Sequence, residues 1–224
     1  MLDNRLSACA SFVSGKGTVV DVGTDHGYLP CYLVENGVCQ KAIAADINVA
    51  PLDSAKSNIK ESGLEDRIIA VLSDGLKNIS PEGVTDVVIA GMGGELIVDI
   101  ISNGKNFYNA GFILQPMTKP ELLREWLWSH GFEIKAEKAC KDEFFYTVIN
   151  AKYIGENSDY TELSCYVGKM GNETETEKGW LLKQASKLSK KGEGLKKSAD
   201  NADKSEHYLK LAEKITAYAE GEKL

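Results

Sequence analysis

Residues 18–28 constrain the fold of this chain more than any other segment. They begin with a β-branched run and end in a turn rich in Gly, Asp and His. A second apolar run, residues 42–45, ends at Asp46, which lies 23 residues after Gly23. A strand, a glycine-bearing turn, a helix and a second strand ending in an acid about 20 residues later are typical of a nucleoside-binding crevice. An ordinary turn with helix-capping Asp and Thr side chains would share these residues.

The turn differs from a dinucleotide-binding fingerprint. Gly23 and Gly27 do not fit the pattern G-x-G-x-x-G, which disfavours a dehydrogenase. Asp21 and Asp25 would repel a pyrophosphate, which binds at N–H groups of a bare helix N-terminus. Acids beside glycines instead favour a ligand with positive charge and hydroxyl donors. S-adenosylmethionine carries a sulfonium, an ammonium and ribose hydroxyls.

Short apolar runs alternate with helical patterns between residues 18 and 150. We expect strands over residues 19–22, 42–45, 68–72, 86–90 and 111–114, and a closing antiparallel hairpin over 132–137 and 144–151. We expect helices over residues 28–36, 49–62, 95–102 and 120–130. This alternation specifies a parallel sheet covered by helices on both faces. The prediction is an α/β, Rossmann-like class I methyltransferase domain with a mostly parallel seven-stranded sheet.

Ligands of such sheets bind beyond the carboxyl ends of the strands. The groups that follow successive strands should therefore converge on one crevice. We expect Asp46 to bridge the ribose hydroxyls of the cofactor and Asp74 to meet its adenine amino group. The expected cofactor-binding residues are Asp21, Gly23, Asp25, His26, Asp46, Ile47, Ser73, Asp74, Gly75, Ala90 and Gly91.

Composition narrows the cellular setting and the partners. The chain has 224 residues, five scattered cysteines and three histidines, which favours a reducing cytoplasm and no metal site. No apolar run reaches about 18 residues, so no membrane span is expected. Net charge is −7, yet residues 178–214 carry ten Lys against five acidic side chains. A polyanion could dock on this lysine-rich region, although a solvated helical hairpin would have the same composition.

The C-terminal region predicts a second, smaller unit. Residues 153–177 are polar and aperiodic and are expected to form a linker with some local order. Two apolar stripes follow, which favour an antiparallel, coiled-coil-like hairpin of helices. Gly192 and Gly194 should weaken or break the first of these helices. We therefore expect a methyltransferase domain over residues 1–155 and a Lys-rich helical domain over 156–224.

Three motifs together resemble the bacterial TrmK family, the tRNA (adenine-22-N1)-methyltransferases. They are residues 21–30 (Asp-Val-Gly-Thr-Asp-His-Gly-Tyr-Leu-Pro), residues 89–94 (Ile-Ala-Gly-Met-Gly-Gly) and residues 113–116 (Ile-Leu-Gln-Pro). The resemblance covers about residues 1–151 and implies S-adenosyl-L-methionine as cofactor, tRNA as partner and a C-terminal coiled-coil domain that helps to hold the tRNA. Residues 166–169 read Tyr-Val-Gly-Lys where a Phe-Gly-Pro-like element would be expected.

Residues 90–94 occupy the position where amino-methylating enzymes of this fold carry Asn/Asp-Pro-Pro-Tyr/Phe. The absence of that tetrad argues against methylation of an exocyclic amine. Adenine N1 has an in-plane lone pair and no proton, so it needs no general base. Catalysis would then be in-line positioning, with nearby carbonyls or acids stabilising the cationic product. The catalytic candidates are Gly91, Met92, Gln115 and His26.

The target base would lie inside folded RNA and would have to be extruded or weakly paired. The candidate contacts to the base are Arg5, Tyr28, Gly93 and Pro116. The candidate phosphate contacts are Lys183, Lys187, Lys190 and Lys191. Two other functions remain open: a small-molecule methyltransferase of the same fold, and a non-catalytic RNA-binding protein with a vestigial pocket.

Overall fold

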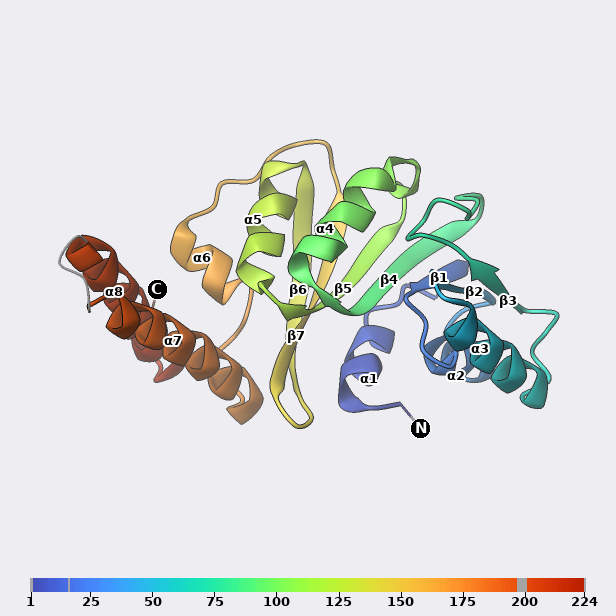
Figure 1. Ribbon diagram of the computed structural model, residues 1–224, viewed down its shortest axis with the longest axis horizontal. Coiled ribbons are helices and arrows are strands. Elements are labelled where there is room, and N and C mark those ends of the chain that lie inside the picture. Colours follow the sequence, from blue (N-terminus) through green and yellow to red (C-terminus); the bar gives the residue numbers. More distant parts are fainter. Residues whose placement is uncertain (1, 16, 197–200, 224) are drawn as a thin grey trace.

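The computed structural model describes residues 2–15, 17–196 and 201–223. A central sheet flanked by helices is followed by two long helices at one end of the molecule (Figure 1). The strands are β1 (Thr18–Val22), β2 (Lys41–Asp46), β3 (Ile68–Leu72), β4 (Val84–Gly93), β5 (Gly111–Thr118), β6 (Phe132–Lys141) and β7 (Phe145–Tyr153). The helices are α1 (Asn4–Ala10), α2 (Tyr28–Glu35), α3 (Val49–Glu61), α4 (Gly94–Asn103), η1 (Lys105–Phe107), α5 (Pro120–Ser129), α6 (Glu162–Val167), α7 (Glu175–Leu195) and α8 (Ala202–Ala219).

The seven strands form one sheet in the order β3-β2-β1-β4-β5-β7-β6. The first five run parallel, and β7 is antiparallel to both β5 and β6. This arrangement confirms the predicted seven-stranded, mostly parallel sheet. The strand order reverses between β1 and β4, which is where open α/β sheets bind their ligands.

Two buried clusters show which helices cover each face of the sheet. On one face, α1, α2 and α3 pack on Val19, Val88 and Ile113. On the other, α4 and α5 pack on Val20, Val87 and neighbouring strand residues. Successive residues of β1 and β4 therefore point to opposite cores, as the pleat requires. Their continuous apolar runs follow from burial on both sides.

The end of β4 differs from the prediction. The strand was expected to stop at Ala90, but it continues to Gly93 and stays paired with β5. The register shifts on either side of Met92, and Gly91 has a φ of +78°. Glycine adopts this left-handed conformation without the steric cost that a Cβ would bring. The Gly-Met-Gly-Gly segment is therefore an irregular strand end held by the sheet.

Helix α1 had no counterpart in the sequence prediction. The Asp3 side chain caps it by accepting a hydrogen bond from the Leu6 N–H at 2.8 Å. The Asp142 carboxylate, in the turn between β6 and β7, accepts hydrogen bonds from the Asn4 and Arg5 N–H groups, each at 3.2 Å. This turn and its own N-cap hold α1 against the sheet, although seven residues are too few to form a stable helix alone.

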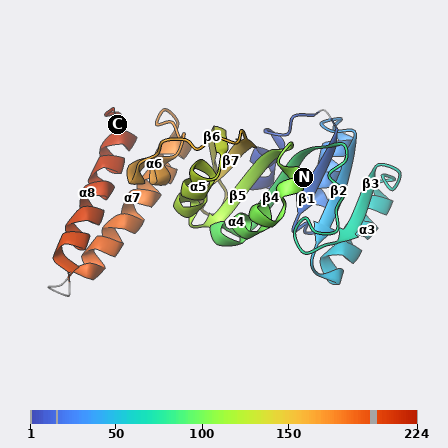
Figure 2. The ribbon, with the colours of Figure 1, turned by 90° about the horizontal axis from the view of Figure 1, so that it is seen from above.

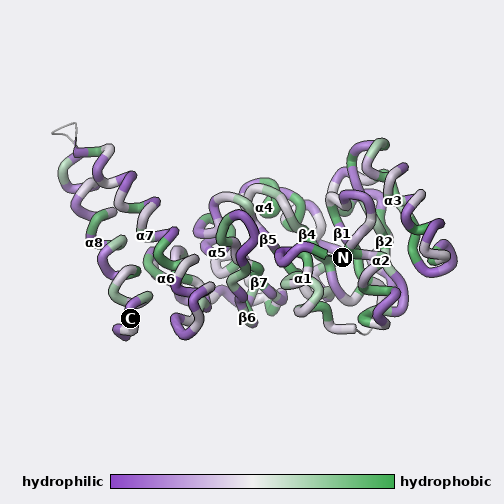
Figure 3. The backbone as a smooth tube through the Cα atoms, turned by 90° about the horizontal axis from the view of Figure 1, so that it is seen from below, coloured by the Kyte–Doolittle hydropathy of each residue, from purple (hydrophilic) through white to green (hydrophobic). Residues whose placement is uncertain are grey.

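The predicted helical hairpin is confirmed, since α7 and α8 pack side by side beyond the sheet (Figure 2). Hydrophilic and hydrophobic residues alternate along both helices (Figure 3). Their buried stripe includes Trp180, Leu181 and Ile215. Gly192 and Gly194 were expected to weaken or break α7, and the break is wrong: α7 is continuous there. A Cβ on Gly192 would lie 2.9 Å from the Leu209 Cγ. The glycine allows α8 to approach closely, which outweighs its low helix propensity.

A buried ion pair connects the sheet domain to the C-terminal helices. The Arg124 guanidinium of α5 donates to the Glu137 carboxylate of β6, and both side chains are fully buried. The same guanidinium donates to the Cys165 carbonyl at 2.8 Å, and the Lys169 N–H donates to Glu137 at 3.1 Å. A Cβ on Gly168 would lie 2.3 Å from a Glu137 oxygen. Any residue larger than glycine at position 168 would therefore collide with the ion pair.

A groove separates the β6–β7 turn from the C-terminal helices. It is lined by Lys141 and Phe145 of the hairpin and by residues of both helices, including Ala219 and Glu220 at the end of α8. The end of α8 therefore lies near the same turn that holds α1.

Candidate active site

A cavity of about 480 Å³ lies at the carboxyl edge of the sheet, where the strand order reverses. Residues of the turn after β1, of the end of β4 and of α1 surround it. The lining residues discussed below are Asp3, Arg5, Asp21, Gly23, Asp25, Tyr28, Ala90 and Gly91. The structure thus brings together the first and fourth strand ends, and it adds α1, which the sequence prediction placed only through Arg5.

The turn after β1 is held by both neighbouring strands. The N–H groups of Gly23 and Thr24 donate to the Ala45 carbonyl of β2 at 2.8 and 2.9 Å. Gly23 has a φ of +77°, and a Cβ there would lie 2.2 Å from the Met92 Cε of β4. The positive φ favours glycine at this position, and Met92 packs directly over it, so two of the predicted motifs meet at the floor of the cavity.

Asp21 is the buried acid of the cavity. It lies in β1 and is only 6% exposed, and burial raises the pKa of its carboxyl to about 6. A smaller part of this rise in pKa comes from the negative charge of Asp46. A cationic group bound in the cavity would compensate this unfavourable charge, which suits an ammonium better than a phosphate.

Asp25 and His26 lie at the exposed rim. The Asp25 carboxylate is 82% exposed and lies 3.2 Å from the His26 Nε2. His26 has a left-handed φ of +57°, and its ring stacks on Tyr28 with centroids 5.3 Å apart. The His26 carbonyl accepts a hydrogen bond from Asn58 of α3 at 2.8 Å, which holds the strained backbone in place.

The ends of β2 and β3 continue the same edge but do not line the cavity. Asp46 closes β2 as predicted, and its Oδ1 accepts from the Asn48 N–H at 2.7 Å. Ile47 is 61% exposed beside it. Asp74, after β3, pairs with Lys77 at 2.5 Å. The buried Ser73 hydroxyl donates to the Gly75 carbonyl at 2.8 Å and shapes that turn.

Gln115 lies behind the cavity and is completely buried. Its Oε1 accepts a hydrogen bond from the Gly91 N–H at 3.0 Å, and the Arg5 guanidinium donates to the same oxygen at 3.5 Å. Its amide nitrogen donates to the Pro116 carbonyl at 3.2 Å. Gln115 therefore positions Gly91 and Arg5, which both line the cavity, rather than facing the cavity itself.

The remaining candidates near β4 support the strand ends. Pro116 is buried and paired with Met92 across β4 and β5. A Cβ on Gly93 would lie 3.2 Å from the Thr118 Oγ1, and one on Gly94 would lie 2.5 Å from the Lys119 carbonyl. These glycines let the start of α4 lie close to the loop after β5.

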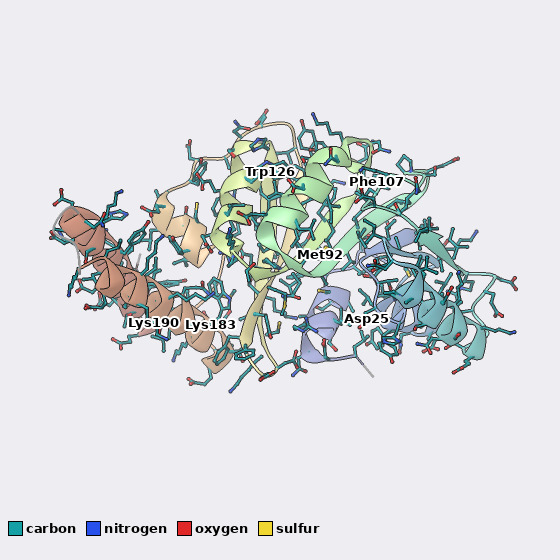
Figure 4. The ribbon with its side chains drawn as sticks, in the orientation of Figure 1. Asp25, Met92, Phe107, Trp126, Lys183 and Lys190 are labelled. Atoms are coloured by element: carbon teal, nitrogen blue, oxygen red, sulfur yellow. The ribbon has the colours of Figure 1, made fainter. Side chains whose placement is uncertain are left out.

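The candidate lysines lie on α7, away from the cavity. Asp25 and Met92 mark the carboxyl edge of the sheet in Figure 4, whereas Lys183 and Lys190 follow each other along α7. Lys183 is half-buried, and burial together with nearby Lys187 lowers its pKa. Lys187 and Lys190 are exposed, and the Lys191 ammonium lies 3.9 Å from the centre of the Tyr208 ring.

Sequence reasoning missed three parts of this region. It gave no role to Asp3, although an Asp three residues before Leu6 is a recognisable N-cap signal. It did not connect Gln115 with Gly91, and it gave no role to Arg124 or Glu137.

Among residues 2–15, 17–196 and 201–223, no cluster of three or more His, Cys, Asp or Glu side chains could hold a metal. Within the same ranges, no helix is long and apolar enough to cross a membrane.

Comparison with known proteins relates this geometry to a family. A family model described as a methyltransferase domain matches residues 2–149. The tRNA (adenine(22)-N(1))-methyltransferase of Bacillus subtilis (strain 168) is 33% identical over 75% of this chain and 72% of its own length.

Solved structures extend the similarity to the C-terminal helices. Streptococcus pneumoniae Sp1610 in complex with S-adenosyl-L-methionine is 30% identical with a TM-score of 0.81, covering 96% of this chain and 100% of that one. M. capricolum TrmK in complex with S-adenosyl-homocysteine is 29% identical with a TM-score of 0.81, covering 98% of each chain. The family model spans the residues that line the cavity, the solved structures cover nearly the whole chain, and this chain belongs to the TrmK family of methyltransferases.

Proposed function

We propose that this chain transfers the methyl group of S-adenosyl-L-methionine to N1 of an adenine in tRNA, at position 22 as in its family. The supporting observation is similarity along nearly the whole chain, cavity and C-terminal helices included. The Bacillus subtilis tRNA (adenine(22)-N1)-methyltransferase aligns over 75% of the chain, and the TrmK structure with bound S-adenosyl-homocysteine covers 98% of it. A small-molecule methyltransferase would not need the lysine-bearing hairpin.

The residues along the carboxyl edge suit the three parts of the cofactor. We assign Asp21, Asp25 and Gly23 to its methionine end, because a buried carboxylate favours an ammonium. Asp46 and Ile47, at the end of β2, would meet the ribose. Ser73, Asp74 and Gly75 would meet the adenine at the end of β3, with Ala90 and Gly91 across the crevice.

When bound, the cofactor supplies an electrophilic methyl on a sulfonium. Adenine N1 attacks with its lone pair, and the electrons of the broken bond remain on sulfur. The enzyme's task is to place N1 in line and to exclude water. We assign this positioning to Gly91 and Met92, which Gln115 and Pro116 hold from behind. His26, Tyr28, Gly93 and Arg5 are the proposed contacts to the base.

The positive charge acquired by the base suits an acidic setting. Asp25 lies at the rim, and Ala90 and Gly91 of the β4 end line the same cavity. Negative potential placed where positive charge develops lowers the barrier. The lysines of α7, in the proposed helical domain over residues 156–224, would hold tRNA phosphates beside the sheet domain over 1–155. A cytoplasmic location follows from the tRNA substrate.

The decisive experiment incubates the protein with unmodified tRNA and isotope-labelled S-adenosyl-L-methionine, and then maps the label by mass spectrometry. The expected product is 1-methyladenine at position 22. A methyl group on cytosine, guanine or adenine N6 would refute the proposal. Calorimetry with S-adenosyl-homocysteine adds a separate check, because a vestigial pocket would not bind it.

A further inference from the structure

The turn between β6 and β7 projects from the same edge of the sheet as the cavity. Because β6 lies antiparallel to β7, and β7 antiparallel to β5, β6 runs in the direction of β5. Strand β6 therefore ends, at Lys141, at the carboxyl edge of the sheet. The turn over residues 142–144 extends beyond this edge. The turn contacts α1, which lines the cavity, through the hydrogen bonds of Asp142.

Two aromatic side chains of this hairpin contact cations. The Lys183 ammonium lies 5.7 Å from the centre of the Phe144 ring and 5.2 Å from that of the Tyr146 ring. The Arg5 guanidinium also lies over the Tyr146 ring, 5.6 Å from its centre. Phe144 and Tyr146 meet edge to face with ring centres 6.5 Å apart. We call these four side chains the aromatic strip.

The strip connects α7 with the cavity. Lys183 is anchored at one end, because its ammonium donates to the Phe145 carbonyl at 2.6 Å. At the other end Arg5 lines the cavity and is oriented by Asp3 at 2.7 Å and by Gln115. The strip therefore extends from Lys183 of α7 to Arg5 at the cavity.

Phe144 is the exposed member of the strip. It is 53% exposed at the tip of the turn, where a polar residue would be the usual choice. Aromatic rings set among cations are the recurring surface for unpaired nucleotides, since bases stack on the rings while the cations follow the phosphates. The acidic balance of the rest of the chain gives a negatively charged partner few other places to bind.

We propose that the aromatic strip is a stacking platform for an unpaired nucleotide of the RNA substrate adjacent to the target base. This inference rests on the proposed function, which makes that substrate a tRNA. An extruded base leaves its neighbours partly unstacked, and a ring at the mouth of the cavity recovers part of the lost stacking. In this proposal the Phe144 ring stacks on the base of that nucleotide, and the Lys183 ammonium of α7 contacts its phosphate. Tyr146 and Arg5 lie between this nucleotide and the cavity.

The test compares Phe144→Leu with Phe144→Trp in the full-length protein. Leu keeps an apolar side chain but cannot stack, whereas Trp offers a larger ring. We expect Phe144→Leu to lower kcat/KM for tRNA roughly tenfold and Phe144→Trp to restore it, in line with the loss of one base–aromatic stack. The calorimetric affinity for S-adenosyl-homocysteine should stay at the wild-type value in both variants.

A matched control is available at the opposite edge of the sheet. Tyr160 is 40% exposed, and its ring stacks on Trp128 in the last turn of α5, with centres 6.0 Å apart. Tyr160→Leu should leave kcat/KM for tRNA unchanged. If Phe144→Leu also equals wild type, or if Phe144→Trp is as impaired as Phe144→Leu, the platform proposal is overturned.

A spectroscopic readout separates stacking from a purely structural effect. A tRNA carrying 2-aminopurine next to the target adenine should be quenched on binding to wild type and Phe144→Trp, and not on binding to Phe144→Leu. Equal quenching by all three proteins would overturn the platform. If wild type binds tRNA but transfers no methyl group, the proposed function fails, and the binding and quenching comparison still decides the platform.

Discussion

Arg124 of α5 and Glu137 of β6 form a two-point ion pair inside the protein, with an Arg124 Nη2–Glu137 Oε2 distance of 2.7 Å and an Nε–Oε1 distance of 2.9 Å. Trp180 of α7 packs over the guanidinium, with its ring centre 5.0 Å away. The pair thus lies at the junction of the sheet domain and the C-terminal helices. It fixes the relative position of the cavity and the lysines of α7.

Arg124→Ala should lower the free energy of unfolding by about 3–5 kcal/mol, because it leaves the buried Glu137 charge uncompensated. The double variant Arg124→Met, Glu137→Leu removes both charges and should recover most of that loss. Denaturant unfolding followed by circular dichroism measures both effects. A loss below about 1 kcal/mol in Arg124→Ala would show that the buried pair carries little of the stability.

Asp21 should make stability decrease with rising pH. Burial raises its carboxyl pKa from 3.8 to about 6, so the folded protein binds more protons than the unfolded chain between these values. The free energy of unfolding therefore falls as pH rises through that window, by about 3 kcal/mol at most, and stays low above it. The difference in free energy of unfolding between Asp21→Asn and wild type, measured in urea titrations, should therefore shift in favour of Asp21→Asn from pH 4.5 to pH 7.5. An identical difference at both pH values would contradict this account.

Gln115→Leu should impair catalysis more than folding. The substitution removes the acceptor for the Gly91 N–H and for Arg5 but keeps a side chain of similar volume in a fully buried position. We expect kcat for tRNA methylation to fall about tenfold, equivalent to ~1.4 kcal/mol in the barrier. The free energy of unfolding should change by less than about 1.5 kcal/mol. Unchanged kcat would remove Gln115 from the positioning machinery.

Replacing two glycines of α7 by alanine, one at a time, should change the stability of the protein in opposite directions. A Cβ at Gly192 would lie 2.9 Å from the Leu209 Cγ and 3.0 Å from the Ser205 carbonyl, whereas Gly194 has open space. Gly192→Ala should destabilise by about 1–2 kcal/mol after its gain in helix propensity, and Gly194→Ala should stabilise by about 0.5–1 kcal/mol. Thermal unfolding of both variants gives the sign directly. Equal effects would mean that α7 and α8 are not in close contact at Gly192.

The lysines of α7 should make tRNA binding depend on salt. Each phosphate contact contributes about −0.7 to −0.9 to the slope of log affinity against log salt concentration. The double variant Lys187→Gln, Lys190→Gln should reduce the magnitude of that slope by about 1.5 in filter-binding titrations. Lys56→Gln on α3, whose lysine pairs with Asp53 at 2.9 Å, is the matched control and should leave the slope unchanged. A salt-independent affinity of the wild-type protein for tRNA would show that these lysines do not contact phosphates.

The positions of the strands and the mostly parallel character of the sheet could be predicted because the signals are local. Short apolar runs bounded by polar or glycine-bearing turns predicted β1, β2 and β3 to within one residue at each end, and Asp46 was placed at the end of its strand. The helical hairpin also follows from periodicity within single helices. Helix α1 could not be predicted, since seven residues carry little periodicity and the Asp142 contacts come from far along the chain.

The sequence predicted which strand ends form the site, but it did not predict the contacts between their residues. The hydrogen bond between Gln115 and Gly91 joins residues 24 positions apart, and no pattern within either motif indicates it. Gly192 shows the opposite error, because a rule about isolated helices predicted a break where helix packing requires a small residue. Local propensity gives way to tertiary contact at such positions.

The start of α1 and the end of α8 both lie beside the β6–β7 turn, since that turn holds α1 and the groove next to it is lined by Ala219 and Glu220. This proximity matters for handling the protein. An affinity tag placed before Leu2 would be tethered beside the cavity, which Leu2 and Asp3 line, and could cover the surface where RNA is expected to bind. A histidine tag, which adds charge there at mildly acidic pH, would also distort salt titrations. Preparations for RNA work should therefore carry a cleavable tag, and removing it becomes a step of the binding assay itself.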